Sequence, residues 1–270
     1  MVKFWKMNGA GNDFVVLDNR DETLQLSKAR IAALCHRQRG IGADGLLAVE
    51  PARNGADYRM RYYNADGGEA EMCGNGARCF ARFVNFLEGG ALEKTSFETI
   101  AGVIEGRFSG DRVRIQLSAP FDLKLRQSLD LDGIPHTVHS VNTGVPHAVI
   151  FVDDLAAVDV KRFGAATRHH PHFAPAGTNV NFVRVLAPGH IAIRTYERGV
   201  EDETLACGTG MVASAIVHHE LSDTPSPVLV DVAGGDTLEI GFTRTASGEY
   251  EEVTLLGPAD FTFSGTLPSL

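Results

Sequence analysis

The segment Glu69-Ala-Glu-Met-Cys73-Gly-Asn-Gly76 has a counterpart later in the chain, Glu203-Thr-Leu-Ala-Cys207-Gly-Thr-Gly210. Both fit the pattern Glu-x-x-x-Cys-Gly-x-Gly, and the two cysteines lie 134 residues apart (207 − 73), almost half of the 270-residue chain. A tyrosine-bearing segment of strand-like sequence precedes each motif, and an apolar segment of helix-like sequence follows it. The shared flanks and offset predict two similar halves, each presenting one cysteine at the start of a helix.

Short β-prone runs dominate the rest of both halves, separated by Gly, Asp, Asn and Pro. Strands are expected over residues 14–17, 46–49, 113–117, 148–152, 181–185, 191–194 and 253–256. Helices are expected over 27–40 with a Ser27 cap, from 76 to 89–90, over 159–168 with an Asp159 cap, and over 211–217. The sequence therefore predicts an α+β fold made of two related domains.

The composition of the chain excludes several classes of protein. Hydrophobic residues make up 44% and charged residues 22%, which is typical of a folded chain. A net charge of −9 without a basic cluster gives no support to nucleic-acid binding. The N-terminus lacks the apolar region of a signal peptide, and no stretch approaches the ~18 apolar residues of a membrane span. Four cysteines without a Cys-x-x-Cys pair indicate neither a disulfide framework nor zinc, so a reducing cytoplasm is expected.

The repeated cysteines suggest a specific chemistry. A thiol at the first turn of a helix faces unpaired backbone N–H groups and the positive end of the helix dipole, a setting that favours the thiolate. The glycines around each cysteine leave room for an anionic group to reach those N–H donors. Two such sites suit a carboxylate with a sulfur on each face, where one thiolate takes a proton from carbon and the other thiol delivers one. Cys35 and Cys79 lack this context and are expected to be packing residues.

Two other patterns point to no site. Gly40-x-Gly42-x-x-Gly45 fits the dinucleotide fingerprint in letters, but a helix precedes it and a strand follows, the reverse of what that site needs. The histidines at 169, 170, 172, 218 and 219 have no suitably spaced cysteine or carboxylate beside them, and no metal site is predicted.

Several motifs taken together resemble the diaminopimelate epimerase family. They occur in the family's order, and the resemblance extends over essentially the whole chain to Gly257-Pro258-Ala259. The motifs are MNGAGNDF (7–14), YNADG (63–67), MCGNGARC (72–79), NVNF (179–182), YERG (196–199) and ACGTG (206–210).

The resemblance implies an enzyme that interconverts LL- and meso-diaminopimelate without pyridoxal phosphate, other cofactor or metal, in lysine and peptidoglycan-precursor synthesis. It implies two pseudo-symmetric domains, each a mostly antiparallel sheet wrapped round a central helix, and a homodimer as the usual assembly. The expected domains are residues 1–118 plus 264–270, carrying Cys73, and residues 119–263, carrying Cys207.

The resemblance also assigns roles to individual residues. Cys73 and Cys207 match the acid/base pair, and His147 and Glu197 match positions that tune the pKa values of the cysteines. The residues that match substrate-binding positions are Gly74, Asn75, Gly208 and Thr209, through their backbone, and Asn12, Asn64, Asn179, Glu197 and Arg198. A carboxylate and amides suit the ammonium group at the distal end of the substrate, and a guanidinium suits its distal carboxylate.

The chain departs from the family pattern at three positions. Gly45 stands where many members have Gln, and Val145 where many have Asn, so two side-chain hydrogen bonds to substrate are in doubt. Phe263 stands where some members carry Tyr at the dimer contact, which keeps an aromatic ring without its hydroxyl.

Three other functions remain open on the sequence. A proline racemase-like enzyme would share the cysteine pair, but its ring substrate needs no distal clamp. A thiol redox switch could use Cys73 and Cys207 as a regulatory disulfide, which leaves the glycine-rich cradles without a purpose. A non-catalytic amino-acid-binding module would not require both cysteines. Deuterium exchange from solvent into the substrate α-carbon distinguishes these alternatives.

Overall fold

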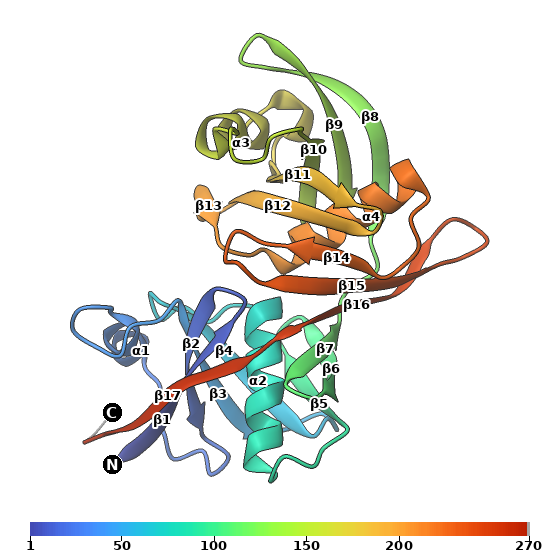
Figure 1. The fold of residues 1–270 in the computed structure, drawn as a ribbon. Coiled ribbons are helices and arrows are strands. Elements are labelled where there is room, and N and C mark those ends of the chain that lie inside the picture. The colour runs from blue at the N-terminus through green and yellow to red at the C-terminus, as the bar shows by residue number, and fades with distance from the viewer. Residues whose placement is uncertain (269–270) are drawn as a thin grey trace. The chain divides into compact units, whose positions relative to one another are not determined.

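The computed structural model describes residues 1–268, so residues 269–270 of the expected segment 264–270 lie outside the described part. The chain divides into two compact units (Figure 1). Unit 1 comprises Met1–Gln116 and the segment from Gly257 onward, and unit 2 comprises Leu117–Leu256. The boundaries expected from the sequence are 118/119 and 263/264.

Unit 1 contains one sheet, whose strands follow the order β17-β1-β2-β3-β4-β5-β6-β7. Most neighbours pair antiparallel, but β2 with β3 and β4 with β5 are parallel. The strands are β1 (Val2–Gly9), β2 (Asn12–Asp18), β3 (Gly45–Pro51), β4 (Tyr58–Asn64), β5 (Lys94–Thr99), β6 (Gly102–Ser109), β7 (Arg112–Gln116) and β17 (Asp260–Leu267).

Unit 2 is built from β8 to β16, and its sheet follows the order β8-β9-β10-β11-β12-β14-β15-β16, with the short β13 also paired to β12. The parallel neighbours are β10 with β11 and β12 with β14. The strands are β8 (Phe121–Leu131), β9 (Ile134–Asn142), β10 (Pro146–Phe151), β11 (Asn179–Ala187), β12 (His190–Glu197), β13 (Asp202–Thr204), β14 (Val228–Asp231), β15 (Thr237–Arg244) and β16 (Tyr250–Pro258).

The two sheets repeat one pairing scheme. From β1 to β7, successive pairs are antiparallel, parallel, antiparallel, parallel, antiparallel and antiparallel. From β9 to β16 in sheet order, the same six orientations recur in the same sequence. The predicted class, a two-domain α+β fold with mostly antiparallel sheets, is confirmed, and the cysteine motifs belong to a repeat of the whole fold.

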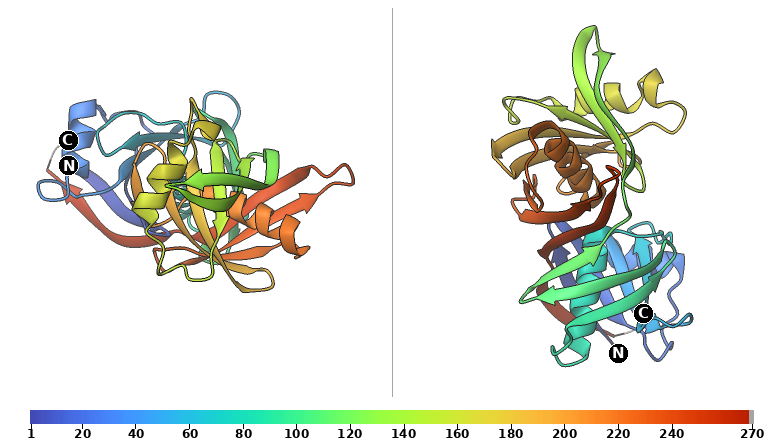
Figure 2. Two further views of the ribbon diagram at one scale, coloured as in Figure 1. Left: turned by 90° about the horizontal axis from the view of Figure 1, so that it is seen from above. Right: turned by 90° about the vertical axis from the view of Figure 1, so that its right-hand side faces the viewer.

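A long helix packs against the inner face of each sheet (Figures 1 and 2). Helix α2 (Gly74–Leu87) contacts every strand from β1 to β7, and α4 (Gly208–Ser222) contacts β9 to β12, β14 and β15. Helix α2 buries Phe80, Phe83 and Val84 completely. Helix α4 is buried on all sides from Gly210 to His218, as its nearly uniform apolar sequence predicts. Each central helix thus forms the core of its unit and holds its first turn in a fixed place.

Two shorter helices, α1 (Lys28–Cys35) and α3 (Val160–Arg168), cover the outer faces, and a 3₁₀ turn, η1 (Pro171–Phe173), follows α3. The expected caps are confirmed: the side chains of Ser27 and Asp159 accept backbone N–H bonds at the two helix starts. The expected end of α1 at Gly40 is wrong. His36 adopts an extended conformation (ψ 118°), and the Leu34 carbonyl instead accepts N–H bonds from residues 41 and 42.

Within residues 1–268, no helix combines the length and the apolar character that a bilayer crossing needs.

Candidate active site

Both repeated cysteines occupy the N-cap position of the central helix of their unit. Cys73 (φ −135°, ψ 123°) precedes α2, and Cys207 (φ −123°, ψ 109°) precedes α4. The first helical bonds run from Ala77 N–H to the Cys73 carbonyl (2.8 Å) and from Met211 N–H to the Cys207 carbonyl (2.9 Å). The N–H groups of the three residues after each cysteine therefore have no acceptor within their helix, which makes each first turn a potential anion site.

Of the four cysteines, Cys73 alone is partly accessible. Cys207 is buried, with 7% of its surface exposed, and its sulfur lies 3.6 Å from the Thr209 hydroxyl. Cys35 and Cys79 are buried in the core. Burial raises the pKa of Cys35 to about 11 and that of Cys79 to about 12, so both are neutral thiols near pH 7. Their expected packing role agrees with this environment.

In unit 1, two predicted site residues belong to one hydrogen-bonded chain. The Asn75 amide donates to Asn12 Oδ1 (2.6 Å), and the Asn12 amide donates to Asp44 Oδ2 (3.0 Å). At the other end, the fully buried Arg78 donates to Asn75 Oδ1 (2.8 Å) and to the carbonyls of Gly9 and Pro258. This chain fixes the orientation of the two amides beside the first turn of α2.

Charged residues that were not predicted from the sequence hold the Asp44 end of this row of hydrogen bonds in place. Arg37 pairs with both Asp13 and Asp44, and Lys6 pairs with Asp13 at 2.6 Å. Burial alone would raise the pKa of Asp13, but the hydrogen bonds from Arg37 and Lys6 bring it down to about 2. Asp13 was visible as the acidic residue of the 7–14 motif, whereas no sequence signal indicated its partner Arg37.

Asn64, a further predicted site residue, ends strand β4 and is exposed. Its Oδ1 accepts a hydrogen bond from the Tyr62 hydroxyl (2.8 Å). Position 45, which pairs with Asn64 across β3 and β4, has no room for a side chain. A Cβ on Gly45 would lie 2.5 Å from the Tyr63 carbonyl oxygen and 2.9 Å from Tyr62 Cε2. The Tyr62 ring thus covers Gly45 and places a hydroxyl beside Asn64.

In unit 2, the Asn179 side chain connects the first residue of β10 with the residue that follows β12. Its amide donates to the Pro146 carbonyl (3.2 Å), and its Oδ1 accepts from the backbone N–H of Arg198 (2.8 Å). The Arg198 guanidinium donates to the Ala176 carbonyl (3.2 Å). Burial raises the pKa of the adjacent Glu197. Asn179, Glu197 and Arg198 are therefore brought together where β11 begins and β12 ends.

His147 lies next to Asn179, its partner in the parallel pairing of β10 and β11. Its side chain is 1% exposed, and burial, followed by the positive charge of Arg198, lowers its pKa to about 3. Its Nδ1 lies 3.1 Å from Asn181 Nδ2, and its buried Nε2 contacts no hydrogen-bonding group among the described residues. His147 is therefore a neutral imidazole near pH 7.

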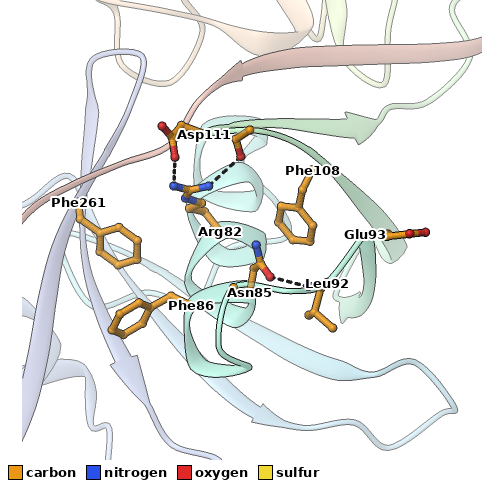
Figure 3. Close-up of a pocket in the computed structure, with 10 residues that line it drawn as sticks. Arg82, Asn85, Phe86, Leu92, Glu93, Phe108, Asp111 and Phe261 are labelled. Atoms are coloured by element: carbon orange, nitrogen blue, oxygen red, sulfur yellow. Dashed lines mark hydrogen bonds and ion pairs between the residues drawn. The ribbon is translucent and has the colours of Figure 1, made fainter.

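A cavity of about 880 Å³ lies elsewhere, beside the C-terminal half of α2 (Figure 3). Arg82 borders it and is tied to Asp111 by an ion pair. Its lining contains neither cysteine nor histidine and none of the predicted site residues. The lining residues are Arg82, Asn85, Phe86, Gly90, Leu92, Glu93, Phe108, Gly110, Asp111 and Phe261. Its titratable side chains are therefore Arg82 and the carboxylates of Glu93 and Asp111, and it contains neither of the repeated cysteines.

Two equivalent α+β units, each with a central helix capped by cysteine, define the structural class, and solved structures share this fold. A Bacillus anthracis phenazine biosynthesis protein of the PhzF family aligns with a TM-score of 0.74 at 15% identity, over 98% of both chains. A probable proline racemase from Agrobacterium radiobacter K84 aligns with a TM-score of 0.69 at 16% identity, over 99% of this chain and 93% of the other. At these identities the likeness concerns the fold alone.

Sequence comparison is more specific. The profile of the diaminopimelate epimerase family matches residues 4–118 and 139–259. The diaminopimelate epimerase of Chlorobaculum tepidum is 42% identical over 269 residues, which cover 97% of this chain and 99% of the relative. The chain belongs to the diaminopimelate epimerase family.

Proposed function

We propose that this protein interconverts LL- and meso-diaminopimelate by moving a proton at the α-carbon between Cys73 and Cys207. The observation that carries the proposal is the duplicated N-cap cysteine, each at a glycine-rich first turn of a central helix. Family membership indicates which substrate to propose, since the relatives that match over nearly their whole length are named diaminopimelate epimerases.

The proposed reaction balances without an oxidant or reductant. One cysteine, as thiolate, takes the α-proton, and the electron pair of the C–H bond delocalises into the substrate carboxylate. The other cysteine, as thiol, donates its proton to the opposite face of the carbon and becomes the thiolate. Substrate and product differ only in configuration, and the two sulfurs have exchanged protonation states. Because the reverse reaction starts from that exchanged state, each cysteine serves as base in one direction and as acid in the other.

Negative charge that develops on the carboxylate needs stabilisation. Backbone N–H groups at Gly74-Asn75 and Gly208-Thr209 supply it in this proposal, because the first turn of a helix offers unpaired donors and a positive dipole end. The glycines keep these donors accessible. A Cβ at position 74 would meet only Ile115 Cδ1, at 3.7 Å, so the space in front of this turn within unit 1 is open.

The remaining predicted residues bind the distal end of the substrate or tune the cysteines. Arg198 is the proposed partner of the distal carboxylate, and Glu197, with Asn12, Asn64 and Asn179, binds the distal ammonium. His147 and Glu197 are proposed to adjust the pKa values of the cysteines. The neutral state of His147 and the raised pKa of Glu197 suit groups that exchange hydrogen bonds with thiols rather than ion pairs.

The assembly and the pathway are also proposals. We expect a homodimer that works without cofactor or metal, in the cytoplasm, and supplies meso-diaminopimelate for lysine and peptidoglycan-precursor synthesis.

A substrate comparison tests the proposed function. Purified enzyme, kept reduced, is offered LL-diaminopimelate and L-proline in parallel, and the configuration of the products is followed by chiral chromatography. The proposal predicts meso-diaminopimelate and unchanged proline. Racemisation of proline would favour the proline racemase-like alternative. If neither amino acid is inverted, binding of diaminopimelate without isotope exchange would favour the non-catalytic module. A reversible Cys73–Cys207 disulfide that forms once the reductant is removed would then favour the redox switch.

A further inference from the structure

Asn181 occupies a central position in unit 2 and has no role in the function proposed above. It lies on β11 and is fully buried. Its Nδ2 lies 3.0 Å from the Ala148 carbonyl oxygen and 3.1 Å from His147 Nδ1, both on β10. Its Oδ1 accepts a hydrogen bond from the Thr195 hydroxyl on β12 (3.0 Å). The amide therefore joins three adjacent strands.

These contacts determine which way the amide faces. A backbone carbonyl can only accept, so the Asn181 atom that faces Ala148 must be the NH₂ group. The same NH₂ group faces His147 Nδ1, which must then accept as well. An imidazole nitrogen that accepts a hydrogen bond carries no proton, so the single proton of neutral His147 lies on Nε2.

The position of this proton makes His147 Nε2 a hydrogen-bond donor. His147 Nε2 is buried and contacts no hydrogen-bonding group of residues 1–268. A buried N–H without an acceptor is unfavourable, so this group is expected to donate to an ordered water, a ligand or a reacting atom. The ring therefore offers a hydrogen-bond donor, and not a base, to whatever lies before it.

Asn181 also contacts the helix that carries Cys207. A Cβ at Gly210 would overlap Asn181 Oδ1, so the amide lies directly against the third residue of α4. The glycine at this position of the repeated motif consequently does more than expose N–H donors. It allows one buried amide to touch both the first turn of α4 and the imidazole of His147.

We propose that Asn181 is a positioning residue that holds His147 as the Nε2–H tautomer and so makes it a hydrogen-bond donor in the reaction. The consequence for turnover rests on the proposed function. The tautomer itself is a property of the substrate-free protein and can be tested without any activity.

The test is ¹⁵N NMR of histidine-labelled protein in the absence of substrate, with the His147 signals assigned by their loss in His147→Gln. The wild type should show an unprotonated Nδ1 and a protonated Nε2. In Asn181→Asp the carboxylate cannot donate, so the proton of His147 should move to Nδ1 or a second proton should be taken up. His139 is the internal reference, since its Nδ1 accepts from the backbone N–H of Arg126 (3.2 Å) and should not change.

Thr195→Val is the matched control variant. It removes the bond to Asn181 Oδ1 but leaves the NH₂ group between Ala148 and His147, so the tautomer should stay as in the wild type. Asn181→Ser serves if Asn181→Asp does not fold, because the shorter side chain cannot reach both acceptors, and the His147 tautomers should then become mixed. A wild-type His147 protonated on Nδ1, or a folded Asn181 variant with an unchanged tautomer, would overturn the proposal.

Kinetics complete the test. Asn181→Asp should lower kcat at least about tenfold with little change in KM, because loss of the correct histidine tautomer affects the reacting step more than binding. Unchanged kcat together with a changed tautomer would contradict a role for Asn181 in the reaction. If the wild type shows the assigned tautomer but does not act on diaminopimelate, the proposed function fails and the structural assignment of Asn181 stands.

Discussion

At the scale of single residues, burial holds certain titratable side chains in their uncharged form. Cys79 lies six residues after Cys73 on the same segment, yet its thiol is enclosed in the core and its pKa rises to about 12. His147 illustrates the same effect for a base. Its enclosure opposes protonation, and the charge of Arg198 adds to it. These side chains stay neutral for reasons that the sequence motif alone does not contain.

His147 should make the protein less stable in mild acid. Its pKa falls from an ordinary 6.5 to about 3 in the folded protein, so below pH 6.5 the unfolded chain binds a proton that the folded chain does not. Stability is therefore fully present above pH 6.5 and is lost as the pH falls toward 3. Between pH 7 and pH 5, wild type should lose about 2 kcal/mol more unfolding free energy than His147→Gln, at ~1.4 kcal/mol per pH unit.

Denaturant titration of both proteins at the two pH values, followed by circular dichroism, gives this difference. Equal losses in wild type and His147→Gln would mean that His147 is protonated in the folded protein.

At the scale of secondary-structure elements, the two cysteine motifs are related but not equivalent. Gly76 and Gly210 occupy the same position after their cysteines, yet a Cβ on Gly76 would make ordinary contacts of 3.4 Å with Leu47 and Phe14. A Cβ on Gly210 would overlap Asn181 Oδ1, which is held in place from β10 and β12. The start of α4 is therefore more tightly packed than the start of α2.

The two glycines should respond differently to substitution by alanine. Gly76→Ala should be neutral or slightly stabilising, because alanine favours a helix by up to about 1 kcal/mol over glycine. Gly210→Ala should lower the unfolding free energy by about 1–3 kcal/mol, the usual cost of overpacking a rigid core. Chemical denaturation of the matched pair measures both effects. Equal destabilisation of the two variants would show that Asn181 can yield to a side chain at position 210.

Sequence reasoning succeeded where the signal was local. The helix caps at Ser27 and Asp159 and the cysteines at the starts of α2 and α4 follow from patterns within a few residues. The contact between Asn75 and Asn12 joins residues 63 positions apart. Such partners depend on strand register and helix placement, which no short motif encodes. The end of α1 was misplaced for a related reason, since Gly40 is a plausible stop but His36 already leaves the helix.

At the scale of the whole molecule, the repeat extends far beyond the eight-residue motif that revealed it. Each unit follows the same order of antiparallel and parallel pairs around its central helix. The sequence resemblance that revealed the repeat consists of the cysteine motif and the segments on either side of it. A fold can keep its architecture when side chains of similar polarity replace one another, whereas a reacting cysteine has no substitute of equal chemistry.

The predicted homodimer can be tested at Phe263, which is 49% exposed and touches Phe4 edge-on. An exposed aromatic side chain at a dimer contact would be shielded from water in the assembly, so a charge there should be costly. Sedimentation equilibrium should give twice the chain mass for wild type and a single chain mass for Phe263→Lys. Phe121→Lys, at a ring 59% exposed in unit 2, is the control and should remain dimeric. A monomeric wild type would contradict the predicted assembly.

The central claim, that Cys73 and Cys207 form an acid/base pair, is tested most directly by epimerisation in D₂O. Initial rates are measured from LL-diaminopimelate for wild type and for the two variants Cys73→Ala and Cys207→Ala, with Cys79→Ala as the control. Two bases predict that early meso product carries one deuterium at the inverted carbon, whereas recovered substrate is unlabelled, because a returning proton comes from the thiol that took it. Both single variants at 73 and 207 should lose inversion, and Cys79→Ala should keep it. Substantial inversion by either of those two variants, or deuterium in recovered substrate as early as in product, would contradict the account.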